Sequence, residues 1–176
     1  SHPLKAYVRD LRSFATPLRE VENQRDGYSM RVGGLVSQVR KLYDKRGQAF
    51  AFVTLEDMSG KGDVAFFSEA FASFESLLEE DSVIMVEGRV SERNGRLSLQ
   101  AEKAMPLDGI REKMTKAVNV QLLYEEVDNE LLQNLKAHCS RYKGDCELLL
   151  HLKNGGEKGA VIRSRTVRVN PCDELL

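Results

Sequence analysis

Five strand-like segments follow one another between residues 28 and 106, and they restrict the possible folds more than any other part of the sequence. In each segment apolar and polar residues alternate, which is typical of a strand that turns one face toward a core. A short helix is expected between the third and fourth strands, with Ser68 as its cap and an apolar stripe that begins at Phe71. The predicted strands cover residues 28–43, 48–57, 63–67, 82–93 and 96–105.

The connections between the strands carry turn signals. Residues 44–47 and 94–95 are typical of tight hairpins, because glycine and asparagine tolerate a positive φ. Between the second and third strands, the side chains of Asp57 and Ser59 can bond nearby backbone amides. The pair Gly33-Gly34 breaks the alternation of the first strand, which predicts a bulge or bend where one strand serves two sheets.

Three strands, a helix and two more strands, with a long bent first strand, are the plan of an OB-fold barrel. Residues 4–15 form an expected amphipathic helix before it, and Pro17 ends that helix. The predicted fold class is mainly β with α: a five-stranded OB-fold Greek-key barrel, preceded by a short helix and followed by a small α/β domain. We expect a lead-in helix and connector in residues 1–27, the barrel in residues 28–106 and the α/β domain in residues 107–176.

The α/β domain is expected to hold one helix, capped by Asp128, and four strands. A turn is expected at residues 154–156. The last residues, NPCDELL, are interpreted as the start of a helix that is cut off after Leu176. The four predicted strands cover residues 117–123, 146–152, 159–163 and 166–170.

Composition excludes several classes of protein. The formal net charge is -1, so any binding of nucleic acid has to come from a local basic patch. No apolar run is long enough to cross a membrane and the N-terminus lacks a signal pattern, so we expect a cytoplasmic protein with no membrane partner. The three cysteines are odd in number and are expected to be reduced. Their spacing to His138 and His151 does not suit a metal site.

The candidate binding residues lie at one end of the predicted barrel. OB barrels commonly hold single-stranded nucleic acid on strands two and three, between the loop that joins strands one and two and the loop that joins strands four and five. Basic residues flank both loops, and two aromatic residues at this end could stack on bases. The predicted contacts are Arg40, Lys41, Tyr43, Lys45, Arg46, Phe50, Arg93 and Arg96.

Each of these residues also has a simpler interpretation. Basic residues at hairpins are often only solvated, and a small barrel needs large side chains in its interior. The phenylalanines of the predicted barrel are therefore expected to be mostly core: Phe50, Phe52, Phe66 and Phe67.

The sequence gives little support for catalysis. Glu56, Asp57 and Asp63 cluster near one turn, but capping of the turn explains Asp57. There is neither a phosphate-binding P-loop nor a dinucleotide-binding fingerprint. We expect no catalytic residues, no metal and no cofactor in this chain.

Two long stretches carry a family resemblance: VGGLVSQVRKLYDKRGQAFAFVTLEDMSGKGDVAFFSEAF and LLEEDSVIMVEGRVSERNGRLSL. With the flanking HPLKAY and VNPCDELL, they resemble the OB domain near the C-terminus of the bacterial DNA polymerase III alpha subunit and the residues around that domain. The parent enzyme of this family is a DNA-directed DNA polymerase, a nucleotidyltransferase. The resemblance implies contact with single-stranded template and docking of the clamp-loader tau subunit within the polymerase III holoenzyme. Cys172 stands where the family usually has serine.

The sequence allows two other interpretations of the barrel. The barrel could be the anticodon-binding domain of a class II tRNA synthetase, whose strands follow a similar pattern. That reading predicts a catalytic domain directly after the barrel, and residues 117–176 show no arginine-rich motif of that kind. The barrel could also be a protein-interaction module that binds no nucleic acid, which the near-zero net charge allows.

Overall fold

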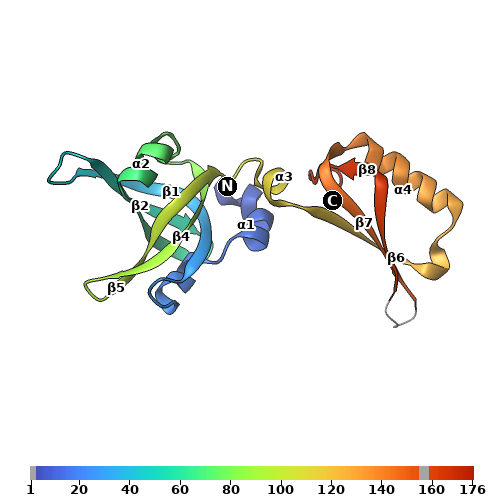
Figure 1. The fold of residues 1–176 in the computed structure, drawn as a ribbon, viewed down its shortest axis with the longest axis horizontal. Helices are drawn as coiled ribbons and strands as arrows, with labels where there is room; N and C mark the ends of the chain where they lie inside the picture. Colours follow the sequence, from blue (N-terminus) through green and yellow to red (C-terminus); the bar gives the residue numbers. More distant parts are fainter. Residues whose placement is uncertain (1–2, 155–158) are drawn as a thin grey trace. The chain divides into compact units, whose positions relative to one another are not determined.

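The computed structural model describes residues 3–154 and 159–176, and the chain divides into two compact units, Ser1–Ile110 and Arg111–Leu176 (Figure 1). Of the turn predicted at residues 154–156, Gly155 and Gly156 lie outside the described residues.

In the first unit five strands close into a barrel in the order β1-β2-β3-β5-β4. Neighbouring strands are antiparallel, except that β3 and β5 pair in parallel. Side chains from alternate positions fill the barrel, and Val32, Val53 and Phe66 are among those with no exposed surface. The OB-type barrel predicted from the sequence is confirmed. Its strands are β1 (Ser29–Tyr43), β2 (Ala49–Asp57), β3 (Gly60–Phe66), β4 (Val83–Arg93) and β5 (Arg96–Pro106).

Strand β1 serves both sides of the barrel, as its glycine pair predicts. Residues 29–35 pair with β4 and residues 35–43 pair with β2. The bulge lies at Ser37, between the paired residues Val36 and Gln38, and not at the glycines. The glycines permit close approach instead: a Cβ at Gly34 would lie 2.5 Å from the carbonyl oxygen of Glu56.

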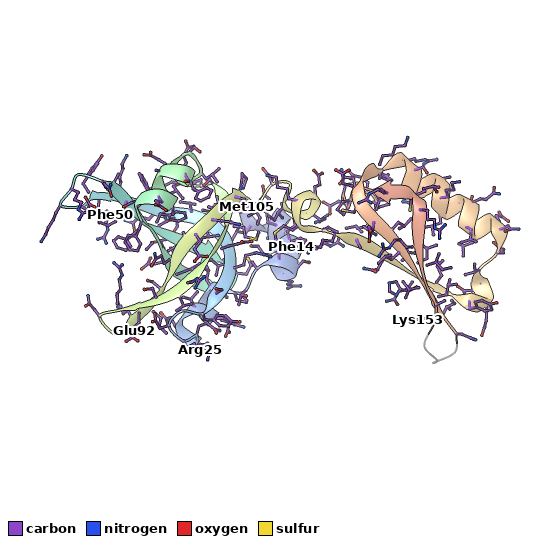
Figure 2. All side chains as sticks on the ribbon, viewed as in Figure 1. Phe14, Arg25, Phe50, Glu92, Met105 and Lys153 are labelled. Carbon is purple, nitrogen blue, oxygen red and sulfur yellow. The ribbon has the colours of Figure 1, made fainter. Side chains whose placement is uncertain are left out.

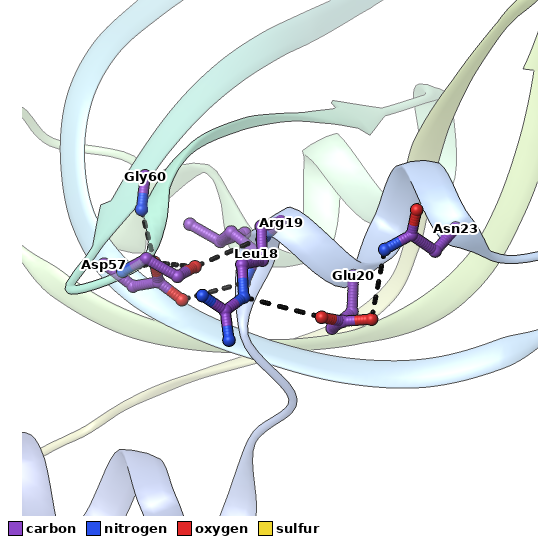
Figure 3. Close-up of polar contacts among 7 residues, drawn as sticks. Leu18, Arg19, Glu20, Asn23, Asp57 and Gly60 are labelled. Atoms are coloured by element: carbon purple, nitrogen blue, oxygen red, sulfur yellow. Dashed lines mark hydrogen bonds and ion pairs between the residues drawn. The ribbon is translucent and has the colours of Figure 1, made fainter.

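The turn between β2 and β3 is organised by the carboxylate of Asp57 (Figure 3). Its Oδ1 accepts hydrogen bonds from the backbone amides of Ser59 (2.7 Å) and Gly60 (3.0 Å) and from the Ser59 hydroxyl (2.6 Å). Its Oδ2 accepts a hydrogen bond from the amide of Leu18 at 2.8 Å. The expected capping of this turn is confirmed, and the same side chain also fixes the segment that enters the barrel.

The segments before the barrel are more closely packed than the sequence suggests. The expected helix begins as a 3-10 turn, η1 (Pro3–Tyr7), and continues as α1 (Val8–Phe14). The predicted polar connector contains a second 3-10 helix, η2 (Leu18–Asn23), in which Leu18 and Val21 are buried. These two apolar residues stand among charged ones, which is why periodicity did not reveal them.

The helix between β3 and β4 is present as α2 (Ser68–Phe74), followed by the 3-10 turn η3 (Glu75–Leu77). Phe71 belongs to the barrel core, as predicted. Ser68 is not the cap: the N-cap position is Phe67, and no side chain caps it. The helix begins one residue earlier than the serine signal implies, because the chain turns directly out of β3.

The second unit is a three-stranded sheet in the order β6-β7-β8, with α4 packed on one face (Figure 1). The strands β6 and β7 are parallel, and β7 and β8 are antiparallel. Asp128 caps α4 as predicted, since its Oδ1 accepts a hydrogen bond from the amide of Leu131 at 2.7 Å. The elements are α3 (Ile110–Met114), β6 (Ala117–Leu123), η4 (Tyr124–Glu126), α4 (Asn129–Arg141), β7 (Lys143–Lys153) and β8 (Val161–Val169).

The prediction of two separate strands in residues 159–163 and 166–170 is wrong. The chain forms the single strand β8, which pairs with β7 on both sides of a register shift between Glu147 and Leu149. The shift absorbs the break in alternation at residues 164–166, so the strand continues through it.

We predict that Gly88→Ala destabilises the barrel by about 3 kcal/mol, because β4 and β5 meet here without room for a side chain. A Cβ at Gly88 would lie 2.1 Å from the carbonyl oxygen of Gln100. The matched control is Gly47→Ala, where φ is +76° but nothing lies within 4 Å of the added atom, and about 1 kcal/mol is expected. Urea unfolding of the two variants measures the difference, and equal losses would contradict this account.

We predict that Asp57→Ala lowers the free energy of unfolding by about 2 kcal/mol, because three backbone amides lose their acceptor. The neighbouring Glu56 bonds Lys61 on the surface, so Glu56→Ala is the control, with an expected change of about 0.5 kcal/mol or less. Thermal or denaturant unfolding compares the two. A loss at Asp57 no larger than that at Glu56 would show that the carboxylate does not hold the entering segment.

Candidate nucleic-acid interface

The alternation of β2 places two phenylalanines on the outside of the barrel. Ala51, Val53 and Leu55 point inward and have no exposed surface. The positions between them therefore face outward, which turns Phe50 and Phe52 away from the core. Figure 2 shows Phe50 projecting at the end of the barrel that carries the β1–β2 hairpin.

The ring of Phe67, the residue directly after β3, packs beside the rings of Phe50 and Phe52. The ring centroids of Phe50 and Phe52 are 5.8 Å apart, and that of Phe67 lies 6.0 Å from the first and 6.3 Å from the second. All three side chains are partly exposed, and we call them the aromatic platform. The expectation that the four phenylalanines are mostly core is wrong: only Phe66 is fully buried, because the narrow interior is filled by smaller residues of β2.

Two arginines lie over the platform. Arg40 on β1 pairs with Phe52 on β2, and its guanidinium carbon is 5.2 Å from the centroid of the Phe52 ring. That of Arg93, at the end of β4, is 4.4 Å from the centroid of the Phe67 ring. Both distances are in the range of cation–π attraction. The structure thus brings together Arg40, Phe50 and Arg93, three of the predicted contacts.

The two hairpins beside the platform carry further predicted contacts. In the β1–β2 hairpin, Tyr43 is 66% exposed, and Lys45 and Arg46 are also exposed. The carboxylate of Asp44 shapes this loop by accepting hydrogen bonds from two backbone amides, at 2.7 and 2.8 Å.

The β4–β5 hairpin has the predicted tight turn. Its two central residues, Asn94 and Gly95, have positive φ of 51° and 74°, as a type I′ turn requires. Arg93 and Arg96 pair across the strands that flank this turn, so both predicted arginines stand at the same tip.

Lys41 does not share the platform face. It pairs with the inward position Ala51, and its ammonium group bonds the Glu75 carboxylate at 2.7 Å and lies 5.1 Å from the centroid of the Phe71 ring. The hydrogen bond to Glu75 raises the pKa of Lys41, although burial acts in the opposite direction. Tyr43 is two residues further along β1 and points to this same side, with the Lys41 nitrogen 5.9 Å from its ring centroid.

The other end of the outer β2–β3 face carries two carboxylates, one of them paired with a lysine. Asp63 accepts a hydrogen bond from the Thr54 hydroxyl at 2.9 Å, and Glu56 pairs with Lys61 at 3.1 Å. Asp63 repels phosphate and Lys61 is already neutralised by Glu56, so the favourable area for a polyanion is the end that holds the platform and the two hairpins.

Sequence reasoning missed Phe52 and Phe67. The signal was present, since Phe50 and Phe52 share one parity on β2 while Ala51, Val53 and Leu55 share the other. The large size of the phenylalanines favoured placing them in the core. The interior of the closed barrel instead holds the smaller side chains of Ala51, Val53 and Leu55.

The described residues, 3–154 and 159–176, contain no group of three histidine, cysteine, aspartate or glutamate side chains that could hold a metal ion. Cys139 and Cys146 are buried in the second unit, and burial raises the pKa of both thiols. The Cys146 thiol donates a hydrogen bond to the carbonyl oxygen of Thr115 at 3.0 Å. Within the same described ranges, none of the helices is both long enough and apolar enough to cross a membrane.

We predict that Phe52→Ala destabilises the barrel by about 1 kcal/mol, whereas Phe66→Ala costs about 4 kcal/mol, because only Phe66 is fully buried. The two substitutions remove the same atoms from neighbouring strands, so they are matched controls for each other. Denaturant unfolding gives both values. Equal losses would mean that Phe52 is a core residue and that the platform does not exist in solution.

Comparison with known proteins supports the assignment of the barrel. Residues 30–107 match the family model described as an OB-fold nucleic acid binding domain. The chain is 32% identical over 178 residues to the DNA polymerase III subunit alpha of Pseudomonas aeruginosa, covering 99% of this chain and 15% of that protein. It is 28% identical over 180 residues to the same subunit of Escherichia coli K12, covering 99% and 16%.

Among solved structures, a mitochondrial single-stranded DNA binding protein of Saccharomyces cerevisiae, Rim1, matches with a TM-score of 0.39 and 13% identity, covering 47% of this chain and 96% of that one. The chain spans about a sixth of the length of the polymerase subunits. It is homologous, along almost its whole length, to one segment of the DNA polymerase III alpha subunits, and its barrel matches the model of an OB-fold nucleic acid binding domain.

Proposed function

We propose that this chain is a non-catalytic part of a replicative DNA polymerase and that its barrel holds single-stranded template DNA. The observation that carries the proposal is the aromatic platform, exposed on the outer β2–β3 face between two hairpins with arginine and lysine side chains. Homology to DNA polymerase III alpha subunits supports DNA as the nucleic acid.

The proposed mechanism separates two kinds of contact. Bases stack on the rings of the platform, and each stacked base contributes about 1–3 kcal/mol. Phosphates are neutralised by Arg40, Lys45, Arg46, Arg93 and Arg96, which makes binding sensitive to salt. Neither contact depends on the identity of the base, which suits a protein that must hold any template. The affinity of the barrel alone is weak and is raised by its covalent attachment to a polymerase body.

We also propose that the second unit helps to dock the clamp-loader tau subunit within the polymerase III holoenzyme. This proposal rests on the family resemblance of the whole chain, which continues through residues 111–176. Binding of purified tau to this chain, measured by surface plasmon resonance with and without residues 171–176, tests it. The chain itself is proposed to need no cofactor, and a cytoplasmic location remains a prediction.

A tRNA anticodon-binding role is the second candidate, because the matched family model carries the name tRNA_anti-codon. Against it, the polymerase subunits match 99% of the chain, including the second unit that lies beyond the barrel. An anticodon stem-loop RNA added to the binding measurements below separates the two. The protein-interaction alternative predicts no binding of any nucleic acid.

We predict that fluorescence anisotropy detects salt-sensitive binding of labelled oligothymidylate in preference to duplex DNA of the same length. Replacing Lys45 and Arg46 together by glutamine should reduce the slope of log K against log salt by about 1.4, since each phosphate contact on a single strand contributes about 0.7. Phe52→Ala should weaken binding about 5-fold or more at all salt concentrations, because stacking is not screened.

The matched control for these variants is Lys41→Gln. It removes a positive charge one residue from Arg40, but its side chain is bonded to Glu75 on the other side of the β-ribbon, so the slope should change little. If wild-type protein does not bind oligothymidylate even at low salt, the template-binding proposal is wrong. If the anticodon stem-loop binds more tightly than oligothymidylate, the second candidate replaces it.

A further inference from the structure

We infer that the guanidinium groups of Arg40 and Arg93 cover the rings of the aromatic platform in the free protein and are displaced when a base stacks there. This exchange makes the site select strands with unstacked bases over other polyanions. This inference rests on the proposed function and concerns how the same site chooses its ligand. In the free protein the two guanidinium groups occupy the surfaces of Phe52 and Phe67 that a base would need.

The distances leave no room for both a base and a guanidinium group. Stacked bases repeat at about 3.4 Å, so a base between ring and guanidinium requires a separation of about 7 Å. The observed separations from the ring centroids are 5.2 Å for Arg40 and 4.4 Å for Arg93. A base can therefore stack on either ring only after the arginine has moved off it.

The covers are free to move. Both arginines are exposed, and within residues 3–154 and 159–176 neither guanidinium group makes a hydrogen bond or ion pair. Arg89, on the same barrel, is different, because its guanidinium bonds the Glu102 carboxylate at 2.8 Å. The aromatic ring is thus the contact that holds each cover in place.

Displacement is favourable only for a ligand with accessible bases. A cation–π contact at an exposed site is weaker than the stacking of a base on the same ring, and the released guanidinium group can then contact a phosphate of the same strand. A duplex, whose bases are already stacked, or a polyphosphate, which has none, offers the phosphate without the base. Such ligands leave the rings covered.

Nuclear magnetic resonance of the arginine side chains tests this exchange. A guanidinium group over a phenyl ring experiences a ring-current shift, so the side-chain signals of Arg40 and Arg93 should be displaced in the free protein. Phe52→Leu assigns the first and Phe67→Leu the second, because each removes one ring. Saturating oligothymidylate should abolish both ring-current shifts. Saturating inorganic polyphosphate should leave them in place, and the Arg89 signal should keep its position in both titrations.

Anisotropy measured on the same samples separates the possible failures. Oligothymidylate that binds while both ring-current shifts persist overturns the inference and leaves the proposed function intact. Loss of the shifts with polyphosphate also overturns it, because the arginines would then respond to phosphate alone. Absence of oligothymidylate binding contradicts the proposed function, and the inference with it.

A second variant tests the cover through affinity. In Arg93→Gln the Phe67 ring is permanently uncovered and one phosphate contact is lost. At low salt this variant should bind oligothymidylate more weakly than wild type. At high salt, where the phosphate contact has little value, it should bind about two- to five-fold more tightly, which corresponds to the strength of one exposed cation–π contact. Weaker binding at every salt concentration would show that Arg93 only attracts the strand and does not cover the ring.

Discussion

Closure of the five-stranded barrel determines how the side chains of the first unit are arranged. A small closed barrel admits only a limited interior volume, and one set of alternate side chains on each strand must fill it. On β2 that set is Ala51, Val53 and Leu55, all without exposed surface. The side chains at the other alternate positions of β2 must therefore face outward. Phe50 and Phe52 are among them, and they form the platform with Phe67. The alternation of side chains along β2 therefore determines both the core and the interface.

The proposed binding site also shows how a chain with a net charge near zero can present a basic surface. Several charged residues elsewhere on the barrel are paired, as in Arg31 with Glu87 and Arg89 with Glu102. The hairpins beside the platform carry arginines and lysines, while the carboxylates of the same face, Asp63 and Glu56, stand at its other end. Local arrangement, and not total charge, sets the field that a polyanion meets.

Local signals were sufficient wherever a residue acts through its own backbone neighbours. The turn residues Asp57, Asn94 and Gly95 and the helix cap Asp128 behave as predicted, because their roles depend on chemistry within a few residues. Signals failed where a distant segment decides the outcome. The packing of Leu18 against Gly62 could not be read from a polar stretch, and a register shift against β7 keeps β8 continuous through a break in its alternation.

Local patterns in the chain were enough to predict the number and order of the barrel strands, the positions of the hairpins and the basic residues at their tips, because periodicity and turn chemistry are local properties. The closed fold was needed to establish which face of β2 is inside. It also shows that Lys41 turns toward Glu75 while Arg40 turns toward Phe52, and that Arg93 reaches the ring of Phe67. A strand with apolar residues on both faces carries no local information about its inner side. That choice is made when the barrel closes and the smaller side chains fit the space that the other strands leave.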